Sequence, residues 1–202
     1  MHCRGDSMYS FGYRVVRTIL TILGGKLKIE NKNKIPSSPY IVVCTHTTWF
    51  DIIYLAFSLW PTPIHYMAKQ ELFTFKPIKY LLTKLNAFPV NRDNPGPSSL
   101  KIPLKLLKNN KVVGIFPTGT RTIEQASLKR GAVTIAMKSG VPILPAIYKG
   151  PLTFKELLQR KEIVVRFGEP ITFEQGISTN KETIDQKTQE MKHIFDELEA
   201  NN

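Results

Sequence analysis

Cysteine is scarce in this chain of 202 residues, which contains only Cys3 and Cys44. Two cysteines cannot build the disulfide framework of a small secreted domain, so this composition favours a reducing compartment. The first ten residues, MHCRGDSMYS, also lack the apolar core of an export signal. We therefore expect a protein of a reducing compartment, and we assign no chemistry to residues 1–7.

The chain also lacks an apolar run long enough to cross a bilayer. A transmembrane helix needs about 20 mostly apolar residues, whereas the first predicted helix, residues 8–27, contains Arg14 and Arg17. Its broad apolar face, with basic residues opposite, predicts a helix that lies on a membrane surface or on the core of the protein itself. We assign residues 1–27 to an amphipathic, membrane-associating helix and residues 28–202 to a globular domain.

Acidic residues are few, with 16 aspartates and glutamates against 28 lysines and arginines, for a formal charge of +12. Such an excess predicts a negative partner, whether nucleic acid, an anionic bilayer or an anionic substrate. A solvated basic surface is the simplest alternative. No motif typical of nucleic-acid recognition accompanies the charge, so we expect an anionic membrane surface and no nucleic acid as partner.

Short apolar runs alternate with helical patterns along the rest of the chain. This alternation predicts a single α/β domain, with a mixed, mostly parallel sheet flanked by helices. The predicted strands are residues 41–44, 64–68, 88–90, 112–116, 141–148 and 163–167. The predicted helices after the first are residues 50–60, 100–107, 131–138 and 181–199, and residues 72–85 form a hydrophobic stretch with lysines that Pro77 interrupts.

His46 and Asp51 form the first candidate catalytic pair. A histidine that removes a proton from a hydroxyl needs a second group to fix its tautomer and stabilise its charged form. Five steps along a helix would leave the two side chains roughly 140° apart. We therefore expect His46 in the loop after a strand and Asp51 in the first turn of the next helix, capped by Thr47 or Thr48. A structural histidine bonded to a nearby carboxylate is the alternative.

The segment 116–122, FPTGTRT, directly follows a predicted strand. Gly119 lets the backbone approach a ligand closely, and exposed amides there can bind an oxyanion or a phosphate. Arg121 offers the planar fork that matches phosphate. An ordinary turn with a surface arginine is the alternative.

Basic residues lie next to predicted elements at two further places in the chain. Arg92 follows the short strand 88–90, and Lys129 with Arg130 precedes the predicted helix 131–138, whose N-terminus favours anions. Each of these basic side chains, taken alone, is explained as an ordinary surface residue. Together they lie in the kind of loops where α/β proteins gather their sites.

These blocks together resemble the glycerolipid acyltransferase family that includes 1-acyl-glycerol-3-phosphate acyltransferase. The family's H-x4-D block is matched by His46 and Asp51, and its arginine after a short strand by Arg92. Its F-P-E-G-T-R-S block is matched by residues 116–122, and its V-P-I-x-P strand by residues 141–145. Residues 67–73 and 129–132 are also similar to the family. The resemblance covers roughly residues 41–168, with the blocks in the family's order.

The resemblance implies an O-acyltransferase of phospholipid biosynthesis, with residues 28–202 as its acyltransferase domain. In this family the histidine is the general base on the acceptor hydroxyl and the aspartate orients it. No metal or bound cofactor is implied. The acyl donor would be acyl-CoA or acyl-ACP, and the acceptor 1-acyl-glycerol-3-phosphate or a related lysolipid, giving phosphatidic acid in the first case. The implied location is the cytoplasmic face of the cell membrane, as a peripheral or monotopic protein.

The resemblance also implies two groups of site residues. The expected substrate-binding residues are Arg92, Thr118, Gly119, Thr120, Arg121, Lys129 and Lys69. The residues expected at the acyl pocket, or in a structural role beside it, are Ile143, Leu144 and Pro145.

Thr118 stands where the family usually has glutamate, so it keeps a hydrogen-bonding oxygen but loses the charge. A different lipid acceptor, or a lipid-binding pseudo-enzyme, therefore stays open. A hydrolase is a further alternative, because Cys44 shares a strand face with His46. The chain has no G-x-S-x-G nucleophile elbow, and a buried cysteine is usually inert. Zinc at Cys44 and His46 would lack a second pair of ligands.

Overall fold

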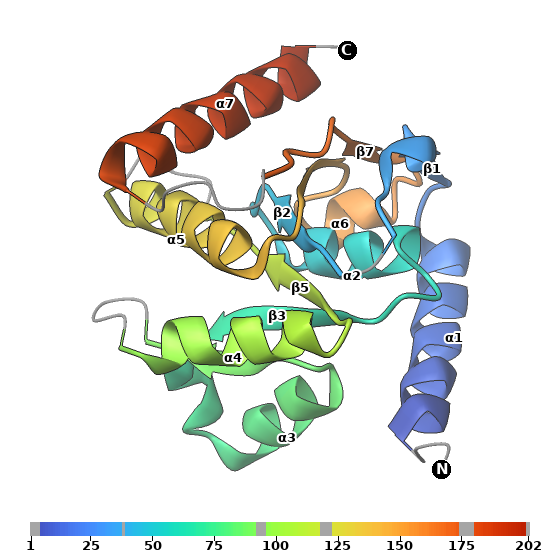
Figure 1. Ribbon diagram of the computed structural model, residues 1–202. Coiled ribbons are helices and arrows are strands. Elements are labelled where there is room, and N and C mark those ends of the chain that lie inside the picture. The colour runs from blue at the N-terminus through green and yellow to red at the C-terminus, as the bar shows by residue number, and fades with distance from the viewer. Residues whose placement is uncertain (1–4, 38, 92–95, 118–122, 174–179, 201–202) are drawn as a thin grey trace.

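The computed structural model describes residues 5–37, 39–91, 96–117, 123–173 and 180–200 (Figure 1). Within them, one seven-stranded sheet has the order β1-β7-β6-β2-β5-β3-β4. All neighbouring strands are parallel except β6 and β7. The predicted α/β class with a mixed, mostly parallel sheet is therefore confirmed. The strands are β1 Leu27–Glu30, β2 Ile41–Cys44, β3 Ile64–Lys69, β4 Phe88–Val90, β5 Val112–Ile115, β6 Ile143–Lys149 and β7 Ile163–Phe167.

Helices cover both faces of this sheet (Figure 1). Side chains alternate along β2, so Val42 and Cys44 belong to the core under α1, α2 and α6, while Ile41 and Val43 belong to the core under α4, α5 and α7. The helices are α1 Gly5–Leu23, α2 Trp49–Ser58, α3 Lys76–Lys84, α4 Ser98–Lys108, α5 Ile123–Ser139, α6 Phe154–Leu157 and α7 Lys181–Ala200, with 3-10 turns η1 Lys32–Lys34 and η2 Gln70–Phe73.

The N-terminal helix packs on the domain and is also exposed. The ring of Tyr13 stacks on Trp60 at 3.8 Å, and Leu20 is buried in the same core. On another side of α1, Val16, Ile19 and Ile22 are exposed. One side of this helix therefore packs on the protein core, and another side is free to lie on a membrane surface. Its association with a membrane stays a prediction. Over the described ranges, every helix is too short or too polar to cross a membrane.

Two differences from the predicted boundaries change the interpretation of the site and of the domain division. The first helix ends at Leu23, and Leu27 already pairs with Ile163 of β7, so the division after residue 27 falls inside β1. The helix predicted from Gly131 begins at Ile123 instead. A single glycine costs only about 1 kcal/mol inside a helix, and the good helix formers before Gly131 offset that cost. The prediction that Lys129 and Arg130 precede a helix N-terminus is therefore wrong, since both lie within α5.

Candidate active site

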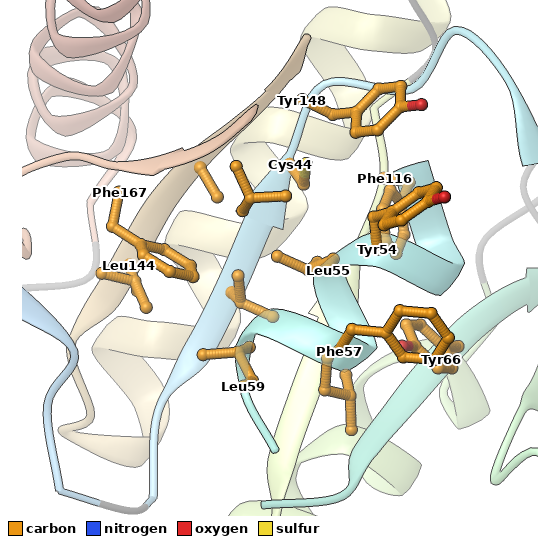
Figure 2. Packing of buried hydrophobic residues seen from close by; sticks show 14 of the residues in the cluster. Cys44, Tyr54, Leu55, Phe57, Leu59, Tyr66, Phe116, Leu144, Tyr148 and Phe167 are labelled. Atoms are coloured by element: carbon orange, nitrogen blue, oxygen red, sulfur yellow. The ribbon is translucent and has the colours of Figure 1, made fainter. Parts of the chain in front are cut away.

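His46 lies just beyond the carboxyl end of β2, which runs between β5 and β6 in the middle of the sheet. Open sheets of parallel strands gather their ligand sites at this edge. The imidazole packs against Phe116, with ring centroids 5.5 Å apart at an angle of 63°. Figure 2 shows Phe116 with Cys44 and Tyr54 in the core beneath this edge. The fold thus places His46 at the border between the buried core and solvent.

Asp51 is the direct partner of His46. The imidazole Nδ1 lies 2.9 Å from Oδ1 and 3.2 Å from Oδ2 of the carboxylate. The Asp51 side chain is 0% exposed, whereas 27% of the His46 side chain is exposed. A buried carboxylate is a strong acceptor, so it holds the proton on Nδ1 and leaves the lone pair on Nε2. The predicted pairing of these two side chains is confirmed.

The start of α2 fixes the position of Asp51. The amides of Thr47 and Thr48 donate to Oδ2 at 2.8 and 3.0 Å, and Thr48 forms a capping box with Asp51. The buried carboxylate therefore has three donors, as a buried anion requires. Thr48 is the cap, one of the two residues expected. The double role of Asp51, at once cap and histidine partner, was not anticipated, although the spacing Thr48-x-x-Asp51 is that of a capping box.

Tyr148 of β6 was also missed by the sequence reasoning. Its ring stacks on Tyr54 at 5.9 Å (Figure 2), and its hydroxyl donates to the carbonyl of Pro151 at 3.1 Å. Burial raises the pKa of Tyr148, and the nearby carboxylate of Asp51 raises it further. One residue beyond Pro151, the carbonyl of Leu152 accepts from the Thr48 hydroxyl at 3.1 Å. The loop after β6 is thereby joined to the segment that carries His46.

Cys44 is completely buried. Burial raises the pKa of the Cys44 thiol well above its usual range, and the Asp51 carboxylate adds to that effect. Because the thiolate is the reactive form, this environment opposes a role as nucleophile. The described part of the chain contains no cluster of three or more histidine, cysteine or acidic side chains able to hold a metal ion.

The predicted phosphate-binding residues Arg92, Thr118, Gly119, Thr120 and Arg121 lie outside the described residues. Their proposed role therefore stays a prediction.

Other predicted site residues lie on described elements. Lys69 ends β3. The Lys129 Nζ lies 5.8 Å from the ring centre of Phe195 on α7, and Arg130 beside it pairs with Asp185 of the same helix. Lys129 therefore faces α7, and a role in substrate binding stays a prediction.

The apolar segment of β6 lies in the sheet centre. Leu144 and Pro145 are buried opposite Val42 and Val43 of β2, and Ile143 is buried beside them. Leu144 and Ile143 belong to the two cores that support the strand of His46. The expected place of all three residues at an acyl pocket stays a prediction.

Two surface clefts lie away from this pair. One is lined by Lys34, Pro142 and Glu169, and the other by Glu30 and Arg166 among others. Since β7 runs antiparallel to β6, its carboxyl end lies at the sheet edge opposite to His46. Neither cleft can therefore serve the imidazole.

An imidazole steadied by a buried carboxylate, at the carboxyl edge of a mostly parallel sheet, defines an α/β enzyme equipped for general-base chemistry. Comparison with known proteins then gives the family. The chain belongs to the acyltransferase family, whose model matches residues 26–149. It is an acyltransferase.

Several relatives carry a more specific name. The chain is 43% identical over 200 residues to the 1-acyl-sn-glycerol-3-phosphate acyltransferase of Bacillus subtilis, covering 95% of this chain and 100% of the relative. It is 34% identical to the enzyme of that name from Streptococcus pneumoniae, covering 96% and 75% of the two chains. The crystal structure of the 1-acyl-sn-glycerophosphate acyltransferase PlsC from Thermotoga maritima matches with a TM-score of 0.67 at 23% identity, over 100% of this chain and 85% of that one. This last likeness supports the fold.

Proposed function

We propose that this acyltransferase moves an acyl chain from an acyl thioester to the free hydroxyl of 1-acyl-glycerol-3-phosphate, forming phosphatidic acid for phospholipid biosynthesis. The relatives named for this activity support the acceptor. The observation that supports the chemistry is the short contact between His46 and the buried carboxylate of Asp51. A related lysolipid acceptor is the second candidate, because Thr118 replaces the family's usual glutamate.

In the proposed reaction, Nε2 of His46 removes the proton of the acceptor hydroxyl as its oxygen attacks the thioester carbonyl carbon. The new C–O bond forms, the C–S bond breaks, and the leaving thiolate takes the proton from the imidazolium. Asp51 stays ionised and stabilises that imidazolium. A thioester is already activated, so positioning and a base suffice for the transfer. We expect Arg92 and Arg121 to bind the acceptor's phosphate, and either acyl-CoA or acyl-ACP to be the donor.

The decisive assay incubates the purified protein with a panel of lysolipids and both thioester donors, with products identified by mass spectrometry. We expect phosphatidic acid to form, and His46→Ala to lower its rate by on the order of 10²–10⁴-fold, the usual worth of general-base help. Cys44→Ala should retain the rate, because the thiol has no part in the chemistry. Absence of product from every lysolipid would favour a lipid-binding pseudo-enzyme, and an active His46→Ala variant would exclude the proposed base.

We also propose that the enzyme works as a peripheral or monotopic protein on the cytoplasmic face of the membrane. Exposed apolar side chains on α1 and α3 support this, since Ile22, Tyr80 and Leu81 are each more than half exposed. No residue of α3 is buried, and its lysines lie beside the apolar side chains. Co-sedimentation with anionic vesicles should weaken in the double variant Ile22→Ser, Leu81→Ser. Unchanged binding would contradict this docking face.

A further inference from the structure

A third group of exposed apolar side chains lies beside the catalytic pair, separate from α3. It consists of Trp49, Leu152, Phe154 and Leu158, which we call the rim cluster. Their exposed fractions are 67%, 55%, 58% and 51%. Trp49 directly follows the cap of α2, and the cap's hydroxyl bonds the carbonyl of Leu152. Soluble proteins rarely leave such a group of large apolar side chains in water without a function.

The backbone that carries the rim cluster is held in place. Besides the bond from Thr48, the Tyr148 hydroxyl donates to the carbonyl of Pro151. The amide of Leu152 donates to the Glu156 carboxylate at 2.9 Å, and Thr153 caps α6. The apolar side chains therefore point into solvent from a fixed loop. The fold therefore keeps these side chains exposed in the free enzyme. Contact with an apolar phase would remove them from water.

The surroundings of the rim cluster are basic. Lys155, Arg160 and Lys161 are exposed within or next to α6. Of the two acids in this segment, Glu156 bonds back to the amide of Leu152 and the exposed Glu162 interacts with Lys28. This combination of large apolar side chains with flanking cations fits an anionic lipid surface.

The rim cluster adjoins the exposed side of α1. Gly24, just past α1, packs against α6 so closely that a Cβ there would lie 2.7 Å from Leu157 Cδ1. Next along the chain, the carbonyl of exposed Lys26 accepts from the amide of Ile163, beside Lys161. The exposed Ile22 therefore lies close to α6, on the same face of the sheet as α2.

We propose that the rim cluster inserts into an anionic bilayer and brings the exposed side of His46 against the membrane surface. This inference rests on the proposed function, because it matters only if the acceptor is a membrane lipid. Contact with the bilayer through α1 alone would not determine whether His46 faces the membrane or the solvent. Insertion of Trp49 and Leu152 makes His46 face the membrane. The acceptor's hydroxyl can then reach the imidazole while the acyl chain of the acceptor stays in the bilayer.

The fluorescence of Trp49 provides a direct test. In a Trp60→Phe background, Trp49 is the single tryptophan. Vesicles of phosphatidylglycerol should shift its emission to the blue, and phospholipids brominated on the acyl chain should quench it. The matched Trp49→Phe variant, which keeps Trp60, should show little of either change. Protein that co-sediments with vesicles while Trp49 stays unshifted and unquenched would overturn the proposal, and so would a shift produced by self-association without lipid.

A kinetic comparison separates this inference from the proposed function. The double variant Phe154→Ser, Leu158→Ser should lose roughly tenfold or more in rate on acceptor held in vesicles, because two apolar anchors are removed. Its rate on a short-chain acceptor, monomeric in solution, should be that of the parent enzyme. Gln159→Ser, exposed in the same turn, is the control and should behave as the parent. Equal rates of variant and parent on vesicles would refute rim insertion, whereas failure of the proposed function would leave every protein inactive on both acceptors.

Discussion

Asp51 shows how one side chain can serve the fold and also the chemistry that we propose. Its carboxylate caps α2 through the amides of Thr47 and Thr48, and it holds Nδ1 of His46. Because all these donors converge on one buried group, formation of the first turn of the helix also places the carboxylate beside His46. Removing the charge and removing the whole acceptor should therefore have different consequences.

Two substitutions at this position separate the roles. Asp51→Asn keeps one oxygen for the amides but loses the charge that stabilises the imidazolium, so we expect a large loss of rate with a moderate loss of stability. Asp51→Ala leaves all the donors without an acceptor. Each buried donor left unsatisfied should lower the free energy of unfolding by about 1–3 kcal/mol. Urea unfolding should show that Asp51→Ala is clearly the less stable of the two. Full activity in Asp51→Asn would refute the orienting role.

His65 of β3 predicts a pH dependence of stability. Among the described residues its Nδ1 has no hydrogen-bond partner, and burial lowers the pKa of this histidine below the ordinary value of about 6.5. Above that pH the side chain is neutral in both states, so its contribution to stability is fully present. As pH falls from about 6.5 through the lower folded-state pKa, only the unfolded chain gains the proton, and stability is lost.

His65→Gln, which does not titrate, should reduce this loss. The measurement is the free energy of unfolding in urea at pH 7.5 and pH 5.5 for both proteins. We expect a smaller difference between the two pH values in the variant. Because the other histidines are common to both proteins, an identical pH dependence would mean that His65 is not the group responsible.

The sequence predicts part of the site and misses another part, for a physical reason. The pairing of His46 with Asp51 follows from local geometry, because both residues lie within one strand–loop–helix segment. The stacking of Tyr148 on Tyr54 and the bond from Thr48 to Leu152 depend on β6 lying beside β2. No local pattern specifies that neighbour, so these contacts were not predictable.

At the scale of elements, some short strands were predicted with their observed bounds. The bounds expected for β2, β4 and β7 agree with the structure, because each is a short and mainly apolar segment. The edge strand β1 was missed, since its four residues, LKIE, include two charges and form no apolar run. The order of the strands was also beyond prediction, because it depends on contacts between distant segments.

The connection from α1 to β1 offers a sharp test of packing. A Cβ on Gly25 would overlap the carbonyl of Lys161, and backbone cannot move aside as a flexible side chain can. Gly25→Ala should therefore lower the free energy of unfolding by about 1–3 kcal/mol or more. Gly12→Ala is the matched control, since nothing lies within 4 Å of its Cβ position in α1. It should stabilise by about 0.5–1 kcal/mol, the difference between alanine and glycine in a helix.

Thermal or urea unfolding of both alanine variants measures these effects. If Gly25→Ala were as stable as the parent, the close approach of the α1–β1 connection to Lys161 would not exist in solution. A destabilised Gly12→Ala would instead indicate that α1 is not helical at that position.

At the scale of the whole molecule, the His46–Asp51 pair and an exposed apolar surface lie together. His46 is at the carboxyl edge of the sheet, with the rim cluster beside it, while the two clefts at the opposite edge lack the catalytic pair. In the proposed docking, the formal charge of +12 attracts the whole molecule to an anionic surface at long range, before any side chain inserts. Attraction by charge and insertion by apolar side chains should respond differently to salt.

Salt should therefore weaken the binding of this enzyme to anionic vesicles without abolishing it. Raising the ionic strength from about 0.1 M to 1 M shortens the Debye length from about 10 Å to about 3 Å. Each basic residue near the surface contributes about 1 kcal/mol at low salt, so the partition coefficient should fall by roughly tenfold or more. Binding to zwitterionic vesicles, measured by the same co-sedimentation, should be weaker and nearly independent of salt. Equal binding to both kinds of vesicle at low salt would show that the positive charge has no part in docking, and the basic excess would then need a different partner.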